Sequence, residues 1–203
     1  MALAAASTEI VRYASIRRIQ LISVVWMSVE VLVSLVAAVR AQSVVLFAFG
    51  GDSIIELASA LLILFHFSSA FLSERVAAKT AAVLLYLLAA FIIFASIFSL
   101  MGFWLEPQPS YMGMTLLVFA GFIMPWLATE KRRLARESGS SALAADATQS
   151  AVCGWLSWIA LGGLAANAMF GLSWADEMAA LALVPLVVKE GRLAWQAKGC
   201  LCC

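Results

Sequence analysis

The sequence has little charge and almost no histidine. Charged residues make up 12% of the 203 positions, and His66 is the only histidine. The formal net charge of +1 gives no reason to expect a nucleic-acid partner. Apolar residues make up 64% of the chain, whereas a soluble domain is about 45–50% apolar. The composition therefore excludes an ordinary soluble domain.

Catalytic and disulfide patterns are also missing. The chain has neither a His-Glu-x-x-His motif nor a Ser/His/Asp set, so we expect no enzyme and no resident cofactor. The start, with Glu9, lacks the basic and apolar regions of a signal peptide. Three of the four cysteines, Cys200, Cys202 and Cys203, crowd the end, where adjacent cysteines are poor partners for each other. This tail is typical of soft-metal capture, palmitoylation or an unstructured end.

What the chain does have is a series of long apolar segments, with a mean hydropathy of +0.99. A helix needs about 20 apolar residues to cross a bilayer core, and lipid cannot satisfy open backbone groups, so the spanning elements are helices. We expect an all-α membrane protein with a single six-span domain over residues 1–203 and no C-terminal soluble domain. The expected spans are 19–39, 44–67, 76–101, 112–128, 143–169 and 175–193.

The basic residues predict the orientation, because they concentrate on the cytoplasmic side of membrane proteins. With both termini cytoplasmic, every lysine and arginine except Arg40 lies inside. The stretch from Glu130 to Ser141, which includes Lys131 and Arg136, is expected to form a basic and then flexible cytoplasmic loop.

Two acidic residues interrupt the second apolar segment. Asp52 and Glu56 are four residues apart, so on a helix they share one face, one turn apart. A carboxylate in the membrane costs about 2.5–3.5 kcal/mol on insertion scales, and two neighbouring carboxylates also repel each other. A cation, a proton or a polar cavity would compensate them. We interpret the pair as a metal or proton site in a transporter; the alternative is a neutral pair that is hydrogen-bonded to neighbouring helices.

Other polar groups are predicted to lie at a similar depth. At 1.5 Å per residue, Glu30 in the first span and Cys153 in the fifth lie near the midplane together with Glu56. Asp52 lies one turn toward the outside, and Gln149 one turn toward the inside. One site shared by the second and fifth spans is therefore geometrically feasible.

The fifth span presents three of its polar groups on one face. Asp146, Gln149 and Cys153 follow the i, i+3, i+7 spacing. Thiolate and carboxylate ligands suit zinc-like ions. Cys153 could equally act as a small apolar residue, and Gln149 as an interhelical hydrogen-bond partner. Asp146 is a candidate residue for the access of ions or protons, or a helix-terminal charge, and Glu30 is a candidate proton site.

These motifs resemble a known family. The stretch Phe49-Gly-Gly-Asp-Ser-Ile-Ile-Glu-Leu-Ala-Ser59 resembles the second span of the cation diffusion facilitators, the cation efflux superfamily. Met124-Pro-Trp-Leu-Ala128, Asp146-Ala-Thr-Gln-Ser150 and Trp174-Ala-Asp176 resemble its later spans. The likeness is strongest to a small bacterial branch of cation transporters that has the transmembrane domain only.

The resemblance implies a homodimeric antiporter, in the bacterial inner membrane, that exports a divalent metal such as zinc in exchange for protons. The tetrahedral site of the family takes two ligands from the second span and two from the fifth. By position these are Asp52, Glu56, Gln149 and Cys153. The zinc exporters carry histidine and aspartate at the last two positions, so the identity of the metal stays open.

The leading hypothesis is proton-coupled export of zinc-like ions by alternating access. Protons would compete with the metal for Asp52, Glu56 and Glu30, because metal ligands must be deprotonated. The alternative is a non-transporting membrane metal sensor or interaction scaffold. The unusual Gln149 and Cys153 pair and the expected lack of a soluble domain favour that alternative.

Overall fold

The computed structural model describes the backbone of residues 2–66, 74–103 and 107–196. Side chains are described in these ranges from residue 14 onward, except at 62–63, 65–66, 74–78, 81 and 141–142. The cysteine tail and the side chain of His66 lie outside the described residues. The helices are α1 Ala2–Ala41, α2 Val44–His66, α3 Glu74–Leu100, α4 Tyr111–Ser138, α5 Ser141–Phe170 and α6 Trp174–Gln196.

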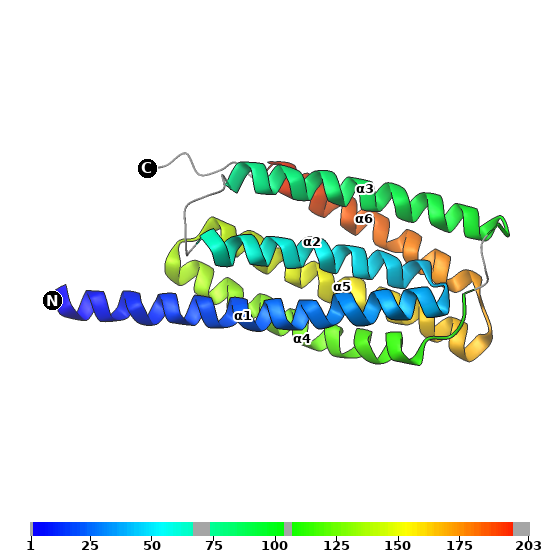
Figure 1. The fold of residues 1–203 in the computed structure, drawn as a ribbon, viewed down its shortest axis with the longest axis horizontal. Coiled ribbons are helices and arrows are strands. Elements are labelled where there is room, and N and C mark those ends of the chain that lie inside the picture. Colours follow the sequence, from blue (N-terminus) through cyan, green and yellow to red (C-terminus); the bar gives the residue numbers. More distant parts are fainter. Residues whose placement is uncertain (1, 67–73, 104–106, 197–203) are drawn as a thin grey trace.

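Successive helices run in opposite directions along one bundle (Figure 1). α4 packs mainly against α5, α1 against α2, and α3 against α6. α2 also contacts α3, α5 and α6, so it lies inside the bundle. α1 begins and α6 ends at the same end of the bundle (Figure 1). The structure thus confirms the predicted all-α class with six helices.

Local signals explain where the later helices begin and end. Ser110 and Ser140 precede α4 and α5, and each serine hydroxyl accepts a hydrogen bond from a backbone N–H in the first turn. Such caps satisfy amides that have no partner within the helix. Gly139 and Gly171 follow these two helices with φ values of 69° and 65°. Glycine adopts this left-handed conformation at little cost, so it ends a helix well.

α4 is longer than the sequence predicts. The apolar segment ends near residue 128, but the helix continues to Ser138, so the predicted loop at 130–138 is wrong. Residues 129–138 contain neither proline nor glycine, so nothing in this segment breaks the helix before Gly139. Arg133 forms ion pairs with Glu130 at 2.8 Å and Glu137 at 3.9 Å, one turn away on either side. Pairs with this spacing stabilise an exposed helix, so the charged segment remains helical.

α1 also begins much earlier than the predicted span at 19–39. It starts at Ala2, and its first part extends beyond the ends of the other helices (Figure 1). Its apolar part, Ala14–Ala41, is the segment that is suited to cross a membrane. The segment around Arg17, which precedes the predicted span, is therefore part of α1.

Five helices of the described chain are long and apolar enough to cross a membrane, namely all except α6. α6 contains the predicted span 175–193, but it also carries Asp176, Glu177 and Glu190, which are buried. Its acids face other helices of the bundle, which explains how a less apolar helix fits among them.

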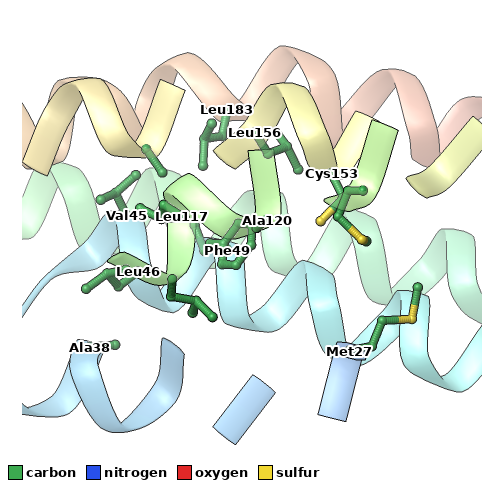
Figure 2. Close-up of a cluster of buried hydrophobic side chains, with 14 of the residues drawn as sticks. Met27, Ala38, Val45, Leu46, Phe49, Leu117, Ala120, Cys153, Leu156 and Leu183 are labelled. Atoms are coloured by element: carbon green, nitrogen blue, oxygen red, sulfur yellow. The ribbon is translucent and has the colours of Figure 1, made fainter. Parts of the chain in front are cut away.

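Apolar side chains fill the interior and also cover the exterior. Phe49 of α2, Leu117 of α4, Leu156 of α5 and Leu183 of α6 meet in a buried cluster that also includes Cys153 (Figure 2). Large apolar side chains are exposed along the outer helices; examples are Val25, Leu32, Leu87 and Phe94, each more than 60% exposed. Exposed apolar surface on this scale marks contact with a membrane or a partner.

Candidate cation site

Four buried carboxylates from three helices lie within electrostatic reach of one another. They are Glu30 of α1, Asp52 and Glu56 of α2, and Glu190 of α6, and none is more than 5% exposed. Asp52 and Glu56 act on both Glu30 and Glu190. Cys153 of α5 is fully buried and is an electrostatic neighbour of all four. We call Glu30, Asp52, Glu56 and Glu190 the acid cluster, and Cys153 is its thiol neighbour.

Two glycines allow the neighbouring helices to approach α2 next to Asp52. A Cβ atom on Gly50 would lie 2.7 Å from the Ser34 hydroxyl of α1. A Cβ atom on Gly51 would lie 2.7 Å from Leu88 of α3. Glycine is the residue that permits so close an approach between helices. The Gly-Gly-Asp sequence thus places Asp52 where α1, α2 and α3 pack closely together.

Some of the carboxylate oxygens in the cluster have donors, and others do not. The Trp26 indole donates to Glu30 Oε1 at 2.6 Å, and the Ser150 hydroxyl donates to Glu56 Oε1 at 2.6 Å. The Oε2 atoms of Glu30, Glu56 and Glu190 are buried and accept no hydrogen bond of ordinary geometry from the described residues. Buried acceptors without donors are costly, so these atoms are suited to a proton or a cation.

A buried ion pair lies beside the cluster. Lys131 Nζ of α4 lies 2.9 Å from Asp146 Oδ2 of α5, and both side chains are fully buried. The same ammonium donates to the Ser150 hydroxyl at 2.8 Å, and Gln20 of α1 donates to Asp146 Oδ2 at 2.8 Å. Through Ser150 the pair is connected to Glu56. Lys131 lies inside α4, so the prediction that it belongs to a flexible loop is wrong.

The structure brings together only part of the predicted ligand set. Asp52, Glu56 and Cys153 are mutual neighbours, together with Glu30. Gln149 is half-buried on α5. In the described part of the chain, no three His, Cys, Asp or Glu side chains are arranged to hold a metal ion. Ligation by this cluster would therefore require side chains to turn toward the ion.

Two members of the site are missing from the sequence-based prediction. Glu190 has Lys189 and Arg192 close to it in the chain, so it looks like part of a charged interfacial segment. Ser150 follows Asp146 by four residues, and this spacing, which places both on one face of the helix, could have revealed it.

Five helices that are long and apolar enough to cross a membrane, together with large apolar side chains on the outer faces, identify the chain as an integral membrane protein. Residues 72–198 match the cation efflux transmembrane domain, so the chain belongs to the cation efflux family, a family of metal-cation transporters. No match was found among curated proteins. The matched region includes α3 to α6, whereas Glu30, Asp52 and Glu56 precede it. The resemblance that the motifs indicated is confirmed at the level of the family.

Proposed function

We propose that the protein exports a zinc-like divalent cation in exchange for protons, by alternating access. The observation that carries the proposal is that the four buried acids of the cluster and the buried Cys153 are electrostatic neighbours in a chain of the cation efflux family. Carboxylate and thiolate ligands together suit zinc-like ions. Ionisable groups inside a membrane are usually functional.

Competition between metal and protons for the same oxygens would couple the two fluxes. A metal ion binds deprotonated ligands, so its arrival releases protons from the cluster. On the other side of the membrane, protons return to the carboxylates and displace the ion. In this scheme the ion is cargo, and neither a catalytic group nor a resident cofactor is needed. The proposal includes cytoplasmic termini, as the basic residues predict, and a homodimer in the bacterial inner membrane, as the resemblance implies.

Flux through reconstituted protein tests the proposal. Proteoliposomes that contain a metal-sensitive dye should report uptake of Zn²⁺ or Cd²⁺ when a pH gradient is applied. Asp52→Asn and Glu56→Gln should abolish the flux. Glu137→Gln, which neutralises an acid whose side chain is 52% exposed on α4, should leave it unchanged. If the proteoliposomes take up none of zinc, cadmium, cobalt, iron and manganese, the proposal that the protein transports metal is overturned.

Metal binding without flux would support the second candidate, a non-transporting metal sensor or interaction scaffold. One observation favours it: a half-buried amide, Gln149, stands where the zinc exporters carry a ligand. The flux and binding measurements on the same preparation separate the two functions.

A further inference from the structure

Lys131 is the single buried base among the residues whose burial is described. It is fully buried, and the buried acids outnumber it seven to one. A lysine in such a place is costly unless it is paired. The buried acids are Glu30, Asp52, Glu56, Asp146, Asp176, Glu177 and Glu190.

The hydrogen bonds around Lys131 have a fixed direction. An ammonium donates and cannot accept, so the Ser150 hydroxyl accepts from Lys131 at 2.8 Å and donates its own proton to Glu56 at 2.6 Å. The positive charge is thus one hydroxyl away from the cluster. Asp146 contacts the same ammonium at 2.9 Å, and both members of the ion pair act electrostatically on Glu56.

We propose that Lys131 is a built-in counter-cation of the acid cluster. We also propose that its ion pair with Asp146 offsets the lysine charge, so that a divalent ion can bind to the cluster. The inference rests on the proposed function, because it assumes that the cluster is the ion site. Without metal, the lysine charge offsets part of the charge of Glu56. When the ion binds, Asp146 balances the lysine, so the two positive charges can coexist. The affinity for metal then depends on both members of the pair.

Opposite effects of the two members on affinity follow from this arrangement. Removing the positive charge by Lys131→Gln should tighten metal binding by about tenfold, since like charges repel strongly at short range in a protein interior. Removing the negative charge by Asp146→Asn should weaken binding by a similar factor. The double variant loses both charges and should bind within about threefold of the wild type. A merely structural pair would shift affinity in the same direction in both single variants, or in neither.

Calorimetric titration of the full-length protein in nanodiscs with Cd²⁺ measures these affinities. Gln and Asn retain hydrogen bonding toward Ser150 and Gln20, which favours folding of the single variants. Arg133→Gln provides the matched control, because it removes a charge that is 63% exposed on the same helix and should leave affinity unchanged. Changes of the same sign in Lys131→Gln and Asp146→Asn would overturn the inference.

A second measurement needs no metal and keeps the test valid if a single variant binds poorly. A double-mutant cycle between Lys131→Gln and Glu56→Gln reads the melting temperature of the metal-free protein. If the lysine balances Glu56, the double variant should lose less stability than the two single losses added together. Additive losses would exclude the counter-ion role. If the wild type binds no divalent ion, the proposed function fails, while coupling in the cycle would still support Lys131 as the counter-ion of Glu56.

Discussion

The carboxylate of Asp176 in α6 caps the start of α2. Its Oδ1 atom accepts a hydrogen bond from the Ser43 hydroxyl at 2.6 Å, and its Oδ2 atom accepts one from the Val45 N–H at 3.1 Å. The first amides of a helix have no partner within it, so an acid from another helix supplies the missing acceptor. The contact is buried and connects the α1–α2 turn to α6.

We therefore expect Asp176→Ala to destabilise the protein. The substitution leaves the Ser43 hydroxyl and the Val45 amide buried without their acceptor, which should lower the free energy of unfolding by about 1–3 kcal/mol. Thermal unfolding in detergent measures the effect. Glu137→Ala removes an acid from the exposed face of α4 and should leave the melting temperature close to that of the wild type. Equal melting temperatures for the two variants would contradict the capping role.

Asp52→Asn separates a metal ligand from a structural acid. Asparagine keeps the shape of the side chain but loses its charge, and it also donates hydrogen bonds where a carboxylate only accepts. If Asp52 is a ligand, the affinity for metal should fall at least tenfold, which corresponds to about 1.4 kcal/mol. Calorimetry on the purified variant, with Glu137→Gln as the control, measures this. A folded Asp52→Asn protein with unchanged affinity would remove Asp52 from the site.

A comparison of Glu190→Gln with Gln149→Ala tests which helix completes the site. Glu190 is an electrostatic neighbour of Asp52 and Glu56, and its Oε2 atom accepts no bond from the described residues. We expect Glu190→Gln to weaken metal binding by about tenfold, because a nearby charge is lost from a buried site. Gln149→Ala should change it much less. The reverse order of effects would restore Gln149 to the ligand set and remove Glu190.

The number and approximate position of the helices follow from the apolar segments, because a bilayer requires long apolar helices. The start of α1 and the end of α4 cannot be predicted from the apolar segments. Hydropathy marks where a chain leaves the lipid, whereas a helix ends where its backbone turns, and α4 turns only at Gly139. Exposed ion pairs such as Arg133 with Glu130 extend the helix beyond the apolar segment.

The acid pair on α2 is visible in the sequence because carboxylates are rare in an apolar segment. Glu190 and Lys131 are harder to recognise, since each lies in a charged stretch that is typical of a membrane surface. Their burial depends on how α6 packs beside α2 and how α4 packs on α5. Such contacts between distant segments have no signal in the local pattern of one helix.

The two adjacent glycines of α5 also differ in a contact between helices that the local sequence does not reveal. Gly162 and Gly163 are identical and lie side by side in the sequence, but only Gly163 faces α6 closely. A Cβ atom at Gly163 would lie 2.4 Å from the Ala179 Cβ and 3.0 Å from the Ala175 carbonyl oxygen, whereas one at Gly162 meets nothing within 4 Å. Gly163→Ala should push the helices apart and cost about 1–3 kcal/mol. Gly162→Ala should be neutral or slightly stabilising, because alanine favours the helix by up to about 1 kcal/mol. Melting temperatures of the two variants, measured side by side in one detergent, decide the matter, and equal values would show that α5 and α6 do not pack at Gly163 as described.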